Sequence, residues 1–476
     1  MTDILDLVYP YLQPTALVLS VIIVATGLVQ NLIYTLQLGF AYHALHRKPP
    51  VPQHQQLWWL YSDVTVPVSL LVPAYDEEAT VVENVRALLA LHYPSFEVVV
   101  VNDGSADGTL SALIEAFDLR AVQRSYEQEV EHKPIRGIYG STRHPNMVVI
   151  DKEHGGKSDA LNAGINLSRS PLFCAVDADS LLEPDALLRA VQPFLEDPEH
   201  VVAVGGTIRV ANGCTIRAGR VIAVGLPARP LPLFQSIEYL RAFLMARVGW
   251  SELRALTLVS GAFGIFRRSV AIAVGGYSHG IVGEDLEIVV KIHRYMRERG
   301  AGYRVPFVPE PVCWTEVPET LAVLGRQRIR WQRGALETFF KHARMLFNPR
   351  YGRIGFLVFG NMLLLDVVGP VVEVAGYLLI PAFWALGMIS WAYLVAFLAL
   401  TFVFGVFISV GSLILEEIEL RRVPRARDLL TLTAAAILEN FGYRQLNNVW
   451  RLIGHWRFLR GVQGWGQMTR TGFRRA

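Results

Sequence analysis

Three long apolar segments restrict what this chain can fold into more than any other feature of its sequence. They cover residues 15–41, 354–389 and 391–415. As a helix, the first segment would be about 40 Å long, which is enough to cross a hydrocarbon core with some tilt. Hydrophobic residues make up 52% of the chain and charged residues only 18%, a composition too apolar for a wholly soluble protein. The sequence therefore predicts a membrane protein in which residues 1–46 form an amino-terminal transmembrane helix.

Basic residues beside these segments predict the orientation of the chain. No Lys or Arg precedes the first segment, whereas Arg47 and Lys48 follow it, so the positive-inside rule places residue 47 onward in the cytoplasm. The start of the chain is acidic and lacks the basic region of a secretory signal, so we expect a retained anchor. The predicted location is the plasma (inner) membrane, with several crossings and a cytoplasmic domain over residues 47–319.

The carboxyl-terminal region, residues 351–476, is predicted to hold two spans and a basic tail. Residues 354–389 contain Pro370 and exceed the length of one span, so they form either one kinked helix or a tight pair. One crossing there and one back through 391–415 would place the arginines that follow inside. The last apolar run, 429–438, is too short to cross, so we expect a re-entrant or interfacial segment, with a fourth span as the alternative.

Charge and cysteine content exclude two other classes of protein. The net charge is only +3, which argues against a general polyanion-binding role, so nucleic acid is not an expected partner. The three cysteines, Cys174, Cys214 and Cys313, have no CxxC spacing. They indicate neither a disulfide framework nor a structural zinc site.

The middle of the chain, residues 47–319, alternates short β-branched runs with stretches of helical periodicity. This pattern predicts an α/β domain with a largely parallel sheet. In such sheets ligands bind beyond the carboxyl ends of the strands, so the residues after each run are candidate site residues. Neither GxGxxG nor GxxxxGKS/T occurs at these positions, which argues against a dinucleotide fold and a Walker phosphate loop.

Polar side chains follow the first three of these strands, and each has two interpretations. Tyr75 could stack on a base that Glu77 also binds, or the acids there could simply cap a helix. Asp103 could accept hydrogen bonds from a base or ribose, or belong to an ordinary Asn/Asp/Gly turn. Lys157, after a glycine pair, could offset phosphate charge or be a solvated lysine at a helix start.

The fourth strand is followed by the pair Asp177 and Asp179. Mg²⁺ and Mn²⁺ prefer oxygen ligands and are usually held by one or two carboxylates together with substrate phosphates. The functional interpretation is therefore a metal–diphosphate site. The alternative is a solvated turn in which Asp179 starts the next helix.

Further candidates lie on predicted amphipathic helices. Glu284 and Asp285 open one of them, either as helix-dipole partners or as a catalytic pair that deprotonates an acceptor hydroxyl. The arginine-rich stretch RQRIRW, residues 326–331, would by itself suit nucleic acid, lipid headgroups or an active site. The helices predicted at 235–248 and 320–346 would either lie against the inner leaflet or pack on the α/β domain.

These motifs, in this order and with apolar spans on both sides, resemble the processive family 2 glycosyltransferases of membranes, which include cellulose, hyaluronan, chitin and poly-N-acetylglucosamine synthases. The matching stretches are PAYDEE, VVNDGSADGT, GGKSDALNAG, DADS, SGAFGIFRRS, VGEDLE and the family's Q-x-x-R-W in RQRIRW. The resemblance implies a GT-A-type nucleotide-sugar-binding domain with a mostly parallel sheet, inserted between transmembrane helices. It also implies amphipathic interface helices, of which residues 320–350 carry Q-x-x-R-W.

By this resemblance the donor site looks like a uridine pocket beside a metal and diphosphate element. The donor-binding residues that it implies are Ala74, Tyr75, Glu77, Asp103, Lys157, Asp177 and Arg328. Asp177 and Asp179 look like the element that holds Mg²⁺ or Mn²⁺.

The resemblance also implies the acceptor side of the site. The residues that look catalytic are Asp285, Gln327, Arg330 and Trp331. Asp285 would be the general base, the Q-x-x-R-W motif would close the site with its arginine on the diphosphate, and Trp331 would stack on the acceptor sugar. Arg326 and Arg333 would then be free to meet the membrane surface.

The function implied is inverting, metal-dependent, processive transfer of a sugar from a UDP-sugar to the hydroxyl of a growing β-linked polysaccharide at the inner membrane face, coupled to export. UDP-GlcNAc and UDP-glucose both fit as donors, with a slight preference for UDP-GlcNAc. An auxiliary export subunit or a homo-oligomer is expected as a partner, together with the lipid bilayer. The alternatives are a single-addition enzyme that loads a lipid carrier and a non-catalytic polysaccharide-export scaffold.

Overall fold

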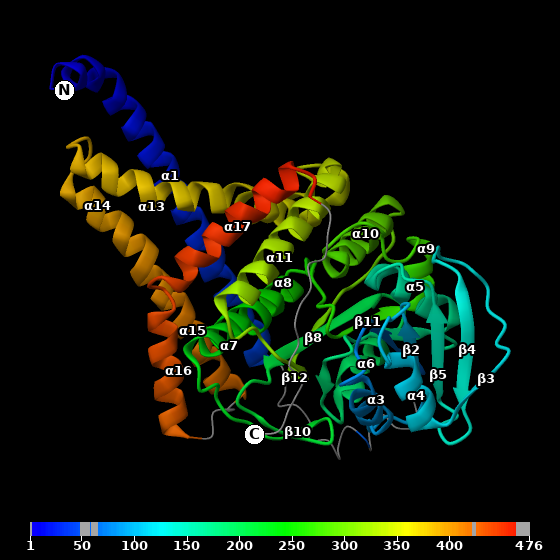
Figure 1. The fold of residues 1–476 in the computed structure, drawn as a ribbon. Helices are drawn as coiled ribbons and strands as arrows, with labels where there is room; N and C mark the ends of the chain where they lie inside the picture. Colours follow the sequence, from blue (N-terminus) through cyan, green and yellow to red (C-terminus); the bar gives the residue numbers. More distant parts are fainter. Residues whose placement is uncertain (1, 48–57, 59–64, 421–424, 463–476) are drawn as a thin grey trace.

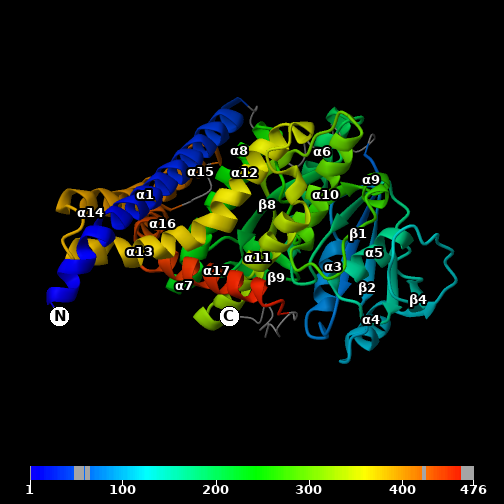
Figure 2. The same cartoon turned by 90° about the horizontal axis from the view of Figure 1, so that it is seen from above.

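The computed structural model describes residues 2–47, 58, 65–420 and 425–462. An α/β domain forms one side of the molecule and long helices gather on the other (Figures 1 and 2). The arginines at 421–422 and the basic residues after 462, on which part of the predicted orientation depends, lie outside the described residues.

A ten-stranded mixed sheet forms the centre of the α/β domain. Across the sheet its strands are β3 (Leu119–Ala121), β4 (Ile135–Ser141), β5 (Met147–Lys152), β2 (Phe96–Asn102), β1 (Val68–Ala74), β6 (Leu172–Ala175), β11 (Gly264–Arg267), β8 (Ala203–Val210), β12 (Phe307–Thr315) and β7 (Leu181–Leu182). The four strands β5, β2, β1 and β6 are parallel, as predicted. Antiparallel pairs flank them on both sides, so the whole sheet is mixed, with one further parallel pair between β8 and β12.

The parallel strands are continuous apolar runs because helices cover both of their faces. Each of Val98 to Val101 in β2 is fully buried. The chain moves from β1 outward to β2 and β5 and then returns to β6 on the other side of β1. Right-handed crossovers therefore place α3 (Val81–Leu89) and α4 (Thr109–Phe117) on one face and α5 (Lys157–Leu167) on the other.

The remaining elements of this domain surround the sheet. They are α6 (Ala186–Glu196), α9 (Arg268–Ala273), α10 (Glu284–Glu298) and the small hairpin of β9 (Thr215–Arg217) and β10 (Arg220–Ala223). The reversal of strand order between β1 and β6 creates a crevice at the carboxyl ends of these strands, which is where open α/β sheets bind ligands.

Three helices among the described residues are long and apolar enough to cross a membrane: Leu12–Arg47, Ile354–Ala385 and Trp391–Ile418. The first belongs to α1 (Thr2–Arg47). The second is one helix and not a tight pair; it consists of η4 (Ile354–Val358), α12 (Phe359–Met362), η5 (Leu363–Val368) and α13 (Gly369–Ala385). The third consists of α14 (Trp391–Leu398), η6 (Ala399–Val403) and α15 (Phe404–Leu420).

Several further helices pack around the junction of the α/β domain and these candidate spans, with α16 (Ala426–Leu438) at the outer edge beside α15 (Figure 1). They are α7 (Pro230–Tyr239), η1 (Leu240–Arg247), α8 (Val248–Glu252), α11 (Leu321–Lys341), the short turns η2 (Ala343–Met345) and η3 (Pro349–Tyr351), α16 and α17 (Tyr443–Leu459). Helix α8 packs on α1, η1 on α15, and α7 on α16. The helix predicted at 235–248, either against the inner leaflet or on the α/β domain, thus contacts strand β8 of that domain as well as α1 and α15.

The carboxyl-terminal helices are more ordered than the sequence suggested. The short apolar run at 429–438 lies within α16, and part of the expected basic tail forms α17, which packs along α11. Glu439, directly after α16, is fully buried and accepts hydrogen bonds from Arg241 of η1 and from Ser409 of α15. These hydrogen bonds connect the end of α16 to η1 and to α15 of the third candidate span.

Candidate active site

Lys157 occupies the centre of the crevice where the strand order reverses between β1 and β6, the switch point of the sheet. It is the first residue of α5, and its Nζ lies 2.6 Å from Oδ1 of Asp177, which follows β6. The same Nζ lies 3.0 Å from Oε1 of Glu284 at the start of α10. Burial lowers the pKa of Lys157, but the two carboxylates outweigh it and raise the pKa above the usual value. The structure thus brings the predicted Lys157 and Asp177 into direct contact around a permanent positive charge.

Glu284, which the sequence indicated together with Asp285 as a helix-dipole partner or part of a catalytic pair, is the second carboxylate of this cluster. Its side chain is buried, and burial raises the pKa of its carboxyl group while Lys157 lowers it. The sequence signal was the pair of adjacent acids at a helix start. Only the three-dimensional arrangement reveals that Glu284 turns to the lysine while Asp285 turns to a different neighbour.

Asp285 is half-buried and held by backbone groups. Its Oδ2 accepts a hydrogen bond from the N–H of Gly261 at 3.1 Å, and its Oδ1 accepts one from Leu286 at 2.9 Å. Burial lowers the pKa of the Arg247 guanidinium to about 10. The nearby Asp285 opposes this shift because its negative charge favours the charged form of Arg247. Asp285 is therefore a fixed carboxylate beside the Lys157 cluster, as a general base would need to be.

Replacing Gly261 with Ala should impair catalysis with little effect on folding. A Cβ at position 261 would lie 2.7 Å from Nζ of Lys157 and 3.6 Å from Oδ2 of Asp285. The ammonium end of the Lys157 side chain is flexible and can move away, but Lys157 would then lose its contacts with Asp177 and Glu284. We expect kcat/KM to fall about tenfold to hundredfold, the usual effect of a small misplacement in an active site. The melting temperature should stay close to that of Gly39→Ala, where the added Cβ meets no atom within 4 Å. An unchanged kcat/KM would contradict this placement.

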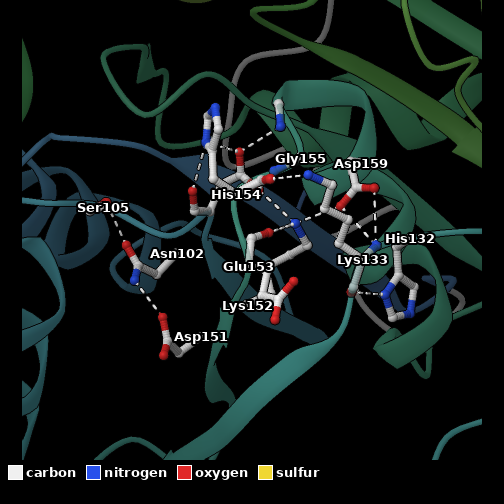
Figure 3. Close-up of polar contacts among 12 residues, drawn as sticks. Asn102, Ser105, His132, Lys133, Asp151, Lys152, Glu153, His154, Gly155 and Asp159 are labelled. Atoms are coloured by element: carbon white, nitrogen blue, oxygen red, sulfur yellow. Dashed lines mark hydrogen bonds and ion pairs between the residues drawn. The ribbon is translucent and has the colours of Figure 1, made fainter.

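Asp103 organises the glycine turn that precedes Lys157. Figure 3 labels His154 and Gly155 of this turn, with Lys152 and Asp159 nearby. Its buried carboxylate accepts hydrogen bonds from the N–H groups of Gly155 at 3.0 Å and Gly156 at 2.7 Å. It also pairs with Lys152 at 2.6 Å, a fully buried lysine that pairs with Asp159 as well. Gly156 has φ +90°, a conformation that favours glycine. Both oxygens of Asp103 are therefore already engaged in shaping this turn.

Tyr75 presents an aromatic ring at the end of β1. Ala74, the last residue of that strand, is buried, whereas Tyr75 is 47% exposed. Its ring centroid lies 4.4 Å from that of His154, in the turn that Asp103 holds. The Glu77 carboxylate lies at the start of α3, because it accepts a hydrogen bond from the hydroxyl of Thr80, the residue before that helix, at 2.9 Å.

Asp177 and Asp179 lie together on the turn after β6 and are both half-buried. Among the described residues, no group of three or more His, Cys, Asp or Glu side chains is placed to hold a metal ion. Two carboxylates fit Mg²⁺ or Mn²⁺ when substrate phosphates complete the coordination. Asp177 and Asp179 therefore suit a metal shared with a diphosphate.

Helix α11 carries the arginine-rich motif and packs closely on the start of α10. A Cβ at Gly334 would lie 2.7 Å from the backbone N of Gly283, directly before Glu284 and Asp285. The contact is reinforced by the N–H of Val282, which donates to Oε2 of Glu337 at 2.8 Å.

The spacing within α11 places the motif on the side that meets α10. Gln327, Arg330 and Trp331 precede Gly334 by seven, four and three residues, so they share its face of the helix. Trp331 is 45% exposed. The structure thus sets this motif on the same side of α11 as the acidic pair.

Two arginines of the motif region are placed differently from the prediction. Arg328 is buried, and its Nη2 donates to Oε2 of Glu238 at 2.7 Å while its guanidinium lies 4.3 Å from the Trp331 ring centroid. Arg333 was expected at the membrane surface, and this is wrong: it is 9% exposed and donates to Oε1 of Glu337 and to the carbonyl of Val462.

The mixed sheet, the acidic turn after β6 and the carboxylates at the start of α10 are those of a GT-A glycosyltransferase. Residues 66–334 match the family model described as glycosyltransferase like family 2, and the chain belongs to this family. The four parallel strands and the cluster around Lys157 lie within the matched region.

Among the relatives in sequence are polysaccharide synthases. The chain is 27% identical over 275 residues to the poly-beta-1,6-N-acetyl-D-glucosamine synthases of Staphylococcus aureus (strain COL) and Staphylococcus epidermidis. In both cases the similarity covers 58% of this chain and 56% of the relative, so it spans about half the length of these proteins.

A solved structure shares the fold over nearly the whole chain. It is a mannosyltransferase from Pyrobaculum calidifontis in complex with GDP-Man and Mn²⁺, at TM-score 0.55 and 20% identity. The superposition covers 95% of this chain and 100% of the mannosyltransferase chain.

Proposed function

We propose that this protein transfers a sugar from a UDP-sugar to the hydroxyl of a growing β-linked polysaccharide, repeatedly, at the inner face of a membrane. The observation that carries this proposal is the contact of Lys157 with Asp177 and Glu284, beside Asp285, at the switch point of a GT-A sheet. The similarity to poly-beta-1,6-N-acetyl-D-glucosamine synthases supports a polysaccharide acceptor and favours UDP-GlcNAc as the donor.

The donor would lie across the carboxyl ends of β1, β2, β5 and β6. The exposed ring of Tyr75 would stack on the base, with Ala74 and Glu77 beside it. Asp103 would support this site by holding the glycine turn, and Lys157 would face the phosphates. Asp177 and Asp179 would hold Mg²⁺ or Mn²⁺, which would compensate the charge of the leaving diphosphate. The Mn²⁺ and GDP-Man of the structurally similar mannosyltransferase support a metal of this kind.

The acceptor would approach from the side of α10 and α11. Asp285 would take the proton from the acceptor hydroxyl as its oxygen attacks the anomeric carbon. The bond from that carbon to the diphosphate oxygen would break on the opposite face, so UDP leaves and the configuration inverts. Arg330 would stabilise the departing charge and Trp331 would stack on the acceptor sugar. Because Arg328 is engaged with Glu238, we assign it to bracing Trp331, and not to the donor.

The apolar helices would place this reaction at the bilayer. Three candidate spans with the amino terminus outside would put the α/β domain in the cytoplasm, where UDP-sugars are made. For export of the polymer, an auxiliary subunit or a second copy of the chain would join the three candidate spans found among the described residues.

The proposal is tested by incubating the full chain in detergent with a panel of UDP-sugars, following UDP release and product length. We expect UDP release with Mg²⁺ or Mn²⁺, its loss on chelation, and products of many sugars. Release with products of one added sugar would favour loading of a lipid carrier. No release with any donor would favour a scaffold and overturn the enzymatic proposal.

A further inference from the structure

The second candidate span has a backbone carbonyl that loses its bonding partner within the helix. Pro370 has no N–H group, so it cannot bond to the carbonyl four residues earlier, that of Asp366. The stretch directly before it, η5, is π-helical, and in a π-helix the lost partner is the carbonyl five residues earlier, that of Leu365. Each unpaired carbonyl in an apolar environment costs free energy unless another donor reaches it.

Side chains from two other helices supply these donors. Nε2 of Gln332, on α11, donates to the carbonyl of Asp366 at 2.6 Å. Nη2 of Arg451, on α17, donates to the carbonyl of Leu365 at 2.6 Å and to Oδ1 of Asp366 at 2.8 Å. The Nε of Arg451 also donates to Oε1 of Gln332 at 2.7 Å. Gln332, Arg451 and Asp366 therefore form a closed set of hydrogen bonds, which we call the polar joint.

The polar joint lies where α11 and α17 run side by side (Figures 1 and 2). A Cβ at Gly454 of α17 would lie 2.8 Å from Cβ of Gln332, so only glycine permits this approach. Gln332 is buried, whereas Trp331, its neighbour in sequence, is 45% exposed. Any shift of α11 at the joint would therefore also move Trp331.

We propose that Gln332 and Arg451 are positioning residues that seat α11 on the carbonyls of Leu365 and Asp366, one of which loses its helical partner because Pro370 has no N–H. The joint fixes Trp331 and Arg330 relative to the second candidate span. The part of this inference that concerns polymer length rests on the proposed function. A polymer end must stay in register with the site between additions, so a loosened α11 releases the acceptor sooner.

Replacing Pro370 with Ala provides the cleanest test, because the added N–H can bond to one of these carbonyls within the helix and so competes with the side-chain donors of the joint. The span should become more regular, so the melting temperature should stay equal or rise. Mean product length should fall about fivefold, a change equivalent to about 1 kcal/mol of docking. Gln332→Leu should shorten products by a similar factor. Pro381→Ala is the matched control, because Pro381 lies in α13 of the same span, beyond the joint.

A second readout does not depend on polymer synthesis. Amide hydrogen exchange of α11 in detergent should be about fivefold to tenfold faster in Pro370→Ala and Gln332→Leu, and unchanged in Pro381→Ala. Wild-type exchange in both joint variants would overturn the inference, as would faster exchange with wild-type product length. If the wild-type protein adds only one sugar, the proposed function fails, and the exchange rates still decide whether the joint seats α11.

Discussion

Replacing Asp285 with Asn should abolish sugar transfer while leaving UDP binding largely intact. Asn keeps an oxygen that can accept the hydrogen bond from Gly261, so the local structure should persist. It cannot accept a proton from the acceptor hydroxyl at neutral pH, and loss of such a base reduces rates by about 10² to 10⁴-fold. The measurements are the rate of UDP release with acceptor present and the affinity for UDP by calorimetry.

Glu284→Gln is the matched control for this substitution, because the two acids are adjacent but contact different partners. Removing the Glu284 charge takes away one partner of Lys157, so its main effect should be on donor affinity and KM. The two variants should therefore separate transfer from donor binding. Lost UDP binding in Asp285→Asn would instead place Asp285 in the donor site or in the fold.

The second large effect is expected for Arg330→Ala. Arg330 shares a face of α11 with the glycine that contacts the start of α10, and we assign it to the departing diphosphate. Removing a group that stabilises charge in a transition state costs about 10² to 10³-fold in kcat. We expect a loss of this size in kcat, with a small change in melting temperature.

Arg326→Ala is the appropriate control, because Arg326 is exposed and lies one turn earlier on the same helix. Arg333 would be a poor control even though it is close in sequence. Its buried guanidinium donates to Glu337 and Val462, so truncating it would destabilise the helix contacts. Equal losses of kcat in Arg330→Ala and Arg326→Ala would contradict the role assigned to Arg330.

Much of the fold could be predicted because its signals are local. Apolar length identified the candidate spans, and β-branched runs followed by polar turns identified the parallel strands. Since the carboxyl ends of parallel strands meet at one edge, the contact of Lys157 with Asp177 followed from their positions after β5 and β6.

The remaining features depend on contacts between distant segments, which no local pattern encodes. Nothing in the sequence distinguishes Glu284 as the partner of Lys157. Asp103 was predicted to bind a nucleotide, and its pairing with Lys152, which in turn pairs with Asp159, had no signal in the sequence. The burial of Arg333 depends on α17, a helix whose basic residues suggested a tail.

The docking of α11 on α17 also has a consequence for the order of biosynthesis. These helices are about 100 residues apart in the chain, so at ribosomal rates about 5 to 20 seconds separate their synthesis. Two candidate spans must be made in between. The α/β domain can thus fold early while the helix that carries Trp331 still lacks its partner. The enzyme would become competent only after α17 is in place, which would delay sugar transfer until both of these candidate spans have been made.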